Sequence, residues 1–253
     1  IISLSADNEE HKYLVFVTRQ GLVKRTELSE FDNIRKSGKI AIGLKDDDEL
    51  IYVGVTTGDD EIAIGANNGR MVRFNEDEVR VMGRSASGVK GIELEDSKVI
   101  GAEVIKPGQL ILIVTENGYG KKSEIEEYRL THRGSKGVKA LNITEKNGMM
   151  VALDCVDADG EYDLMIITDS GTIIKLPLEQ VSTLKRATQG VRLINLKDDQ
   201  KVSTVAVVEK EEMSESEENS KENQTVENTN SDVENTQTEN PDIMEKSNND
   251  ENN

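Results

Sequence analysis

Basic side chains recur at fixed distances from glycines along this chain. Arg84, Arg133 and Arg186 each stand four residues before a glycine, and other Lys and Arg residues follow four further glycines closely. The full set of clustered cations is Lys24, Arg25, Arg35, Lys36, Lys39, Arg73, Arg84, Lys90, Lys121, Lys122, Arg133, Lys136, Lys139, Lys175, Lys185, Arg186 and Arg192. Regularly repeated cations, interleaved with Gly, Ser and Thr that let backbone amides approach, suit the evenly spaced phosphates of a duplex.

These charges have a simpler interpretation, in which each cluster is a solvated loop balanced by neighbouring acids. Recurrence of the clusters in every repeat favours the duplex-binding interpretation. Sequence-specific base readout has little support, because the chain has neither a zinc-finger spacing nor a helix-turn-helix pattern. Aromatic residues make up only 3% of the chain, too few for the stacking platforms of single-strand binders. The pattern therefore predicts contact with the duplex backbone that tolerates any sequence.

Residues that could support catalysis are sparse. His11 and His132 lie in polar stretches without partner spacing, and the glycine-rich turns lack the Lys and Ser/Thr of a phosphate-binding Walker loop. The acidic runs at 45–50 and 157–163 do not fit the twelve-residue calcium loop, so solvated turns are favoured there. None of the tyrosines has adjacent activating arginines and acidic metal ligands. We expect no catalytic residue, metal site or cofactor in this part of the protein.

The charge of the chain is unevenly distributed. The formal net charge is −18, but residues 209–253 hold 15 acidic residues against 3 Lys and contribute −12 of it. Low hydrophobicity and high charge predict a disordered acidic tail there. Residues 1–208 are then only mildly acidic and can carry basic faces. The tail either competes with phosphate for those faces or only increases solubility, and the sequence leaves both open.

The remaining composition limits the cellular context. The chain begins without Met and without a secretory signal pattern, and we expect it to be a fragment of a longer protein. No run of apolar residues is long enough to cross a membrane. The single cysteine, Cys155, excludes an internal disulfide and suits a reducing cytoplasm; its apolar surroundings predict a buried, inert thiol.

Four repeats underlie the chain. An apolar run leads into a polar turn that ends at Gly21, Gly69, Gly118 and Gly171, with successive spacings of 48, 49 and 53 residues. A second glycine follows each of these after 17 to 19 residues, at Gly38, Gly88, Gly137 and Gly190. The first set sits where a β-hairpin needs a residue that tolerates φ > 0.

Short Val- and Ile-rich runs between these turns predict strands, about four in each repeat. The sequence therefore predicts an all-β, propeller-like fold of about four four-stranded antiparallel blades, in repeats near 11–57, 58–106, 107–157 and 158–208, with the tail at 209–253. The alternative is a chain of βαβ units that uses 124–133 and 177–186 as helices, but both segments are short and poorly amphipathic.

These patterns resemble a known family. Residues 16–51, 69–92, 115–141 and 167–194 are similar to the C-terminal domain of the DNA gyrase A protein, and the resemblance covers residues 1–208 in order. The corresponding domain of topoisomerase IV is the nearest alternative, although "NGYGKKSEIEEY" at 117–128 looks more like gyrase. A propeller-like scaffold for protein partners is the alternative from another class, and its usual aromatic anchors are scarce here.

The resemblance implies a β-pinwheel of six blades whose basic outer edge bends and wraps duplex DNA, so that the clustered cations would contact DNA. It implies a module that directs negative supercoiling in an ATP-dependent type IIA topoisomerase, where it joins the rest of gyrase A and the gyrase B protein in an A2B2 holoenzyme. ATP and Mg²⁺ would bind elsewhere in that holoenzyme. The expected location is the bacterial cytoplasm, in association with the nucleoid, and the isolated fragment is expected to be monomeric.

The sequence departs from whole gyrase A in three ways. Only about four blades are present, the glycine- and arginine-rich box of the first blade is absent, and so is the breakage-reunion domain with its tyrosine. We therefore expect the fragment to bind and partly bend DNA, to wrap it poorly and not to cut it.

Overall fold

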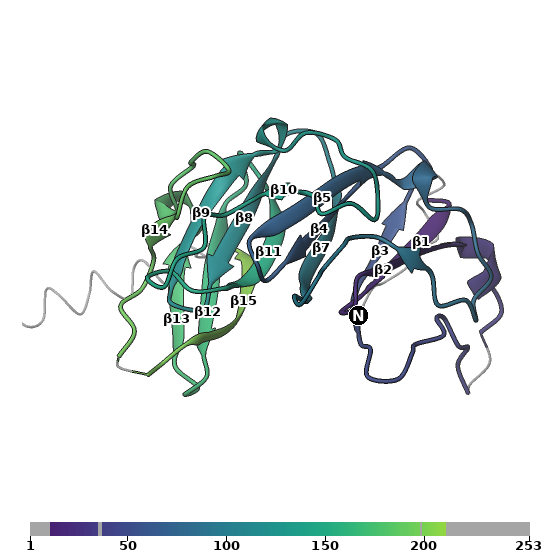
Figure 1. Cartoon of the computed structure of the whole chain (residues 1–253), viewed down its shortest axis with the longest axis horizontal. Helices are drawn as coiled ribbons and strands as arrows, with labels where there is room; N and C mark the ends of the chain where they lie inside the picture. Colours follow the sequence, from purple (N-terminus) through teal and green to yellow (C-terminus); the bar gives the residue numbers. More distant parts are fainter. Residues whose placement is uncertain (1–10, 35–36, 198, 211–253) are drawn as a thin grey trace, which may run out of the picture. The chain divides into compact units, whose positions relative to one another are not determined.

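The computed structural model describes residues 11–34, 37–197 and 199–210. These described residues belong to one compact unit. The predicted tail at 209–253, apart from Glu209 and Lys210, lies outside the described residues. The described part of the unit contains fifteen β-strands and four short 3₁₀ helices (Figure 1). The prediction of an all-β fold is confirmed.

Each repeat contributes three long strands to one antiparallel sheet, which we call a blade. Blade 1 is built on β1 (Tyr13–Thr18), β2 (Leu22–Glu27) and β3 (Leu50–Thr56). Blade 2 contains β4 (Glu61–Ala66), β5 (Arg70–Asn75) and β7 (Val99–Ile105). Blade 3 contains β8 (Gln109–Thr115), β9 (Tyr119–Glu124) and β11 (Met150–Asp157). Blade 4 contains β12 (Tyr162–Thr168), β13 (Ile173–Pro177) and β15 (Val202–Glu209).

The fourth strand of a blade comes from the following repeat. The short strands β6 (Val89–Lys90), β10 (Val138–Lys139) and β14 (Val191–Arg192) pair with β2, β5 and β9 of the preceding blade. Three blades are therefore four-stranded, in the orders β3-β1-β2-β6, β7-β4-β5-β10 and β11-β8-β9-β14, while blade 4 has the three strands β13-β12-β15. Four strands agree with the prediction in blades 1 to 3, while blade 4 has three among the described residues. The exchange between repeats was not predicted from the sequence.

Both sets of repeated glycines have left-handed backbone conformations. The hairpin glycines have φ between 76° and 82°, which confirms the predicted turn chemistry. The second set precedes the exchanged strands and also has positive φ. A Cβ atom at Gly88 would lie 2.6 Å from the carbonyl oxygen of Val23, so this glycine lets the exchanged strand approach the preceding blade closely.

The segments proposed as helices in the βαβ alternative form single turns instead. The 3₁₀ helices are η1 (Leu28–Phe31), η2 (Glu76–Glu78), η3 (Ile125–Glu127) and η4 (Leu178–Gln180). Each follows the second strand of its repeat, and η2, η3 and η4 precede the strands that pair with the preceding blade. The βαβ alternative is therefore wrong.

The hydrophobic core lies between successive blades. The third strands pack in series, with β3 against β7, β7 against β11 and β11 against β15. Three buried clusters each combine residues of two neighbouring blades, for example Val15 with Ile64, and Leu112 with Ile166. The central strands β1, β4 and β8 are covered on both faces, which explains their continuous apolar runs. The opposite margin of the blades, formed by β6, β10 and β14, is called the outer edge below.

Candidate nucleic-acid interface

The clustered cations divide into three groups by exposure. Lys90, Lys136, Lys139, Lys175, Lys185 and Arg192 are exposed. Lys39, Arg73, Arg84, Lys122, Arg133 and Arg186 are half-buried. Lys24, Arg25 and Lys121 are buried, and Arg35 and Lys36 lie outside the described residues. The predicted DNA contacts of the seventeen remain predictions, but the three buried side chains do not belong to the exposed surface of the domain.

In blades 1 to 3, the cation four residues after the hairpin glycine contacts the next repeat. The guanidinium of Arg73 donates to the carbonyl oxygens of Ile125 and Tyr128 at 2.8 and 2.9 Å, on either end of η3. The ammonium of Lys122 donates to Leu178 O in η4 at 3.1 Å. These side chains therefore link β5 and β9 to the 3₁₀ helix of the following repeat.

In blade 1 the same position uses an ion pair. Arg25 donates to Glu76 Oε2 at 3.2 Å, and the Glu76 carboxylate is fully buried. The carboxylate also accepts hydrogen bonds from the hydroxyl of Thr56 and the amides of Gly58 and Asp60. Sequence reasoning missed Glu76, although a signal was present: the other three repeats have Leu or Ile seven residues after the hairpin glycine.

In blades 1 and 3, the lysine three residues after the hairpin glycine is an internal anchor. The Lys121 ammonium donates to the carbonyl oxygens of Lys185 and Arg186 in the following repeat, at 2.8 and 2.5 Å. Lys24 donates to Arg84 O, the equivalent of Arg186 O, and to Ala41 O of its own repeat. Burial lowers the pKa of both ammonium groups from 10.5 to about 8. These buried ammonium groups therefore hold the loops that contain Arg84 and Arg186 by donating to their backbone carbonyls.

The arginine four residues before the second glycine reaches the preceding repeat. Arg84, Arg133 and Arg186 donate to the carbonyl oxygens of Ile40, Lys90 and Lys139, at 3.3, 3.1 and 2.8 Å. All three acceptors stand two residues after the second glycine of their own repeat. The regular spacing of these arginines in the sequence thus corresponds to the same hydrogen bond at each of three junctions between successive repeats.

A backbone hydrogen bond repeats at the same junctions. In each case the donor is the backbone amide five residues after the second glycine of one repeat. The acceptor is the backbone carbonyl two residues before the second glycine of the following repeat. The pairs are Gly43 to Ala86 (3.2 Å), Glu93 to Ser135 (2.9 Å) and Asn142 to Thr188 (3.0 Å). Together with the arginine contacts, these bonds fix the outer edge as a series of equivalent loops.

The exposed cations lie on this fixed frame. Lys90, Lys139 and Arg192 are the second residues of β6, β10 and β14, and each is exposed at the outer edge of its blade. Lys90 pairs with Glu93 at 2.6 Å, and Lys136 pairs with Glu95. On blade 4, Lys175 pairs with Asp163 at 2.8 Å. The outer edge therefore presents regularly placed positive groups, some of them neutralised locally.

Groups suited to other chemistry have structural roles. Cys155 on β11 is a free thiol, and burial raises its pKa, with Glu103 and Asp154 adding to the effect. Within the described ranges, no cluster of three or more His, Cys, Asp or Glu side chains could hold a metal ion. No helix in the described part of the chain is long and apolar enough to span a membrane.

The fold and its edge define a class: a propeller-like β-domain whose blades exchange strands and present cations along the outer edge. The sequence model of the family described as "DNA gyrase C-terminal domain, beta-propeller" matches residues 12–57, 60–106, 109–157 and 162–209. The chain belongs to this family.

The chain is 49% identical over 215 residues to the A subunit of DNA gyrase from Staphylococcus epidermidis, covering 84% of this chain and 24% of the relative. It is 46% identical over 229 residues to the same protein from Staphylococcus aureus, covering 89% of this chain and 26% of the relative. The chain thus spans about a quarter of the length of these relatives.

Two solved structures are similar. The C-terminal domain of DNA topoisomerase IV matches with a TM-score of 0.74 and 28% identity, over 87% of this chain and 69% of that one. The C-terminal domain of DNA gyrase A matches with a TM-score of 0.68 and 25% identity, over 80% of this chain and 68% of that one. The sequence relatives favour the gyrase side of this pair.

Proposed function

We propose that this domain binds duplex DNA along its outer edge and bends it. The observation that carries the proposal is the equivalent placement of Lys90, Lys139 and Arg192 on three exchanged strands, where the carbonyls of Lys90 and Lys139 accept the same arginine contact. Cations at equal intervals on a fixed frame can each neutralise one phosphate, and the resulting affinity depends on salt rather than on base sequence.

In the intact enzyme, we place this domain as the DNA-wrapping module of a bacterial gyrase, acting with the rest of gyrase A and with the gyrase B protein. The names of the relatives support that role. Cleavage of DNA and the use of ATP and Mg²⁺ belong to other parts of the holoenzyme in this proposal. Bending 20–30 bp costs on the order of 1–6 kcal/mol, which phosphate contacts spread along the edge must offset.

The test measures binding of the chain to duplexes of about 150 and about 20 bp across a salt series. The triple variant Lys90→Glu, Lys139→Glu, Arg192→Glu should lower the slope of log K against log salt by about 3, because each lost contact removes roughly 0.9. The control is the triple variant Lys12→Glu, Lys98→Glu, Lys106→Glu, which reverses the charge of three exposed residues outside β6, β10 and β14. Equal losses in both triple variants, or no binding by the unchanged chain at low salt, would contradict the proposal and favour a protein-binding scaffold.

The same series, run with a chain that ends at residue 210, tests the acidic segment. Tighter binding of the shortened chain at low salt, with the difference fading as salt rises, would support competition between the segment and DNA. Bending is checked by ligating nicked circles in the presence of the chain. A small positive linking shift is expected, and a shift as large as that of an intact six-bladed domain would contradict poor wrapping by this fragment.

A further inference from the structure

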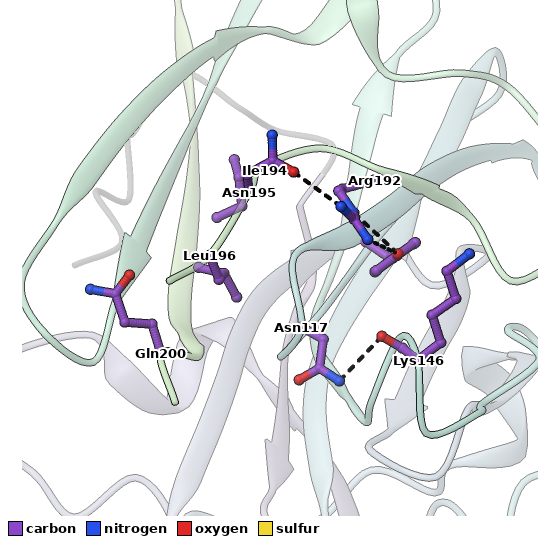
Figure 2. A pocket seen from close by; sticks show the side chains of 8 residues that line it. Asn117, Lys146, Arg192, Ile194, Asn195, Leu196 and Gln200 are labelled. Carbon is purple, nitrogen blue, oxygen red and sulfur yellow. Dashed lines mark hydrogen bonds between the residues drawn. The ribbon is translucent and has the colours of Figure 1, made fainter. Parts of the chain in front are cut away.

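A pocket of about 250 Å³ lies beside the outer edge of blade 3. Its wall includes Tyr119 at the start of β9, Arg192 on β14 and Lys146 from the loop before β11. Figure 2 shows Arg192 and Lys146 at one side of the pocket and Gln200 at the other. The amide side chains of Asn117 and Asn195 complete the polar lining.

Two cations share the ring of Tyr119. The Arg192 guanidinium carbon lies 5.5 Å and the Lys146 ammonium nitrogen 5.6 Å from the ring centroid, within the range of cation–π attraction. Arg192 also donates from Nε and Nη2 to the Tyr119 hydroxyl, at 3.2 and 2.9 Å, and from Nη1 to Asn195 Oδ1 at 3.1 Å. The guanidinium is therefore oriented before any ligand arrives.

Neither cation is neutralised. Within the described ranges, no carboxylate forms an ion pair with Lys146 or Arg192, whereas Lys90, the equivalent of Arg192 in repeat 2, pairs with Glu93. The residue at the position of Glu93 is Asn195 in repeat 4. This substitution leaves the arginine bonded to a neutral oxygen and keeps its full positive charge available.

The pocket is specific to blade 3. The residues equivalent to Tyr119 are Leu22, Arg70 and Thr172, so no other hairpin supplies an aromatic ring. The residues equivalent to Lys146 are Asp47, Ser97 and Asp199. Lys146 thus lies outside the repeating pattern of cations, and the periodic argument could not predict it.

We infer that this pocket binds a phosphate group of the DNA backbone, with Arg192 and Lys146 as the paired donors and Tyr119 as their common support. The inference rests on the proposed DNA-binding function and adds a preferred point of contact to it. A planar guanidinium and an ammonium on one wall can together satisfy two oxygens of one phosphate.

The test uses the whole chain and a duplex of about 150 bp across a salt series. Lys146→Ala and Arg192→Ala should each lower the salt slope by about 1, because each loses a phosphate contact. Tyr119→Phe keeps the ring but removes the hydroxyl that orients Arg192, so a several-fold loss of affinity is expected with a smaller change in slope. Lys98→Ala is the matched control, since Lys98 is exposed but lies outside the outer edge, and its salt slope should match that of the unchanged chain.

The outcomes separate the inference from the function on which it rests. If the unchanged chain binds DNA with a steep salt slope while Lys146→Ala and Arg192→Ala behave like Lys98→Ala, the inference is overturned and DNA binding stands. If the unchanged chain does not bind duplex at low salt, both are overturned. The thermal unfolding midpoint of each variant is compared with that of the unchanged chain, to check that any loss of binding occurs in a folded domain. Lys146→Ala changes an exposed loop residue, so its midpoint should match.

Discussion

Two groups of cations recur at regular spacing: buried ones on β2 and β9, and exposed ones on the exchanged strands β6, β10 and β14. Both groups consist of Lys and Arg, but their side chains make different contacts. Lys121 is fully buried and holds two carbonyl groups of the following repeat. Lys139 is exposed, and its ammonium reaches only Asn142 Oδ1, at 3.3 Å. A repeated charge can therefore belong either to the exposed surface or to a contact between repeats, and the burial of its side chain distinguishes the two.

The largest expected effect comes from the buried ion pair. Glu76→Ala should lower the free energy of unfolding by about 3–5 kcal/mol, because it leaves the Arg25 guanidinium buried without its charge partner. Urea unfolding measures the loss, with the exposed residue of the neighbouring blade, Glu27→Ala, as a control expected to stay within about 0.5 kcal/mol. A change in Glu76→Ala no larger than the control would show that the pair has no anchoring role.

A pair of lysine substitutions tests the comparison directly. Lys121→Met should cost about 1–3 kcal/mol of stability, since two carbonyl groups lose their donor, and should leave the salt slope of DNA binding unchanged. Lys139→Met should show the reverse, with stability within about 0.5 kcal/mol of the unchanged chain and a salt slope lower by about 1. If both variants lose stability alike, the division between joint and surface is wrong.

The smallest effect concerns pH. Between pH 8 and 10.5 the unfolded chain keeps a proton on Lys121 that the folded chain releases, since burial lowers the folded pKa to about 8. The free energy of unfolding should therefore rise with pH in this window, relative to Lys121→Met, which lacks the group. Urea unfolding of both proteins at pH 7.5 and 9.5 measures the difference. A fall in the stability of the unchanged chain relative to Lys121→Met as pH rises would contradict the assigned direction.

Sequence reasoning succeeded where the signal is local. The hairpin glycines need positive φ, and apolar runs such as that of β8 are covered on both faces, so turns and strands followed from residue type. Membership of the family followed from the order of four such repeats. These features depend on neighbours in the chain, and the sequence displays them directly.

The rest depends on contacts between repeats, which spacing alone does not reveal. The burial of Lys24 could not be predicted, because its acceptors at Ala41 and Arg84 come together only when two repeats meet. The two-residue strands β6, β10 and β14 are too short to show a period. Lys146 breaks the repeat pattern, and only its place beside Tyr119 brings it into the site.

The exchange of strands makes the number of blades easy to change during evolution. The donated strands are nearly interchangeable, being Val-Lys, Val-Lys and Val-Arg, and each is received by the same glycine-flanked edge. Loss or duplication of one whole repeat would therefore leave the edge of every internal blade paired, although loss of repeat 2 would also remove Glu76, the charge partner of Arg25. Selection could adjust the number of blades in steps of one repeat, because each donated strand fits the same kind of edge.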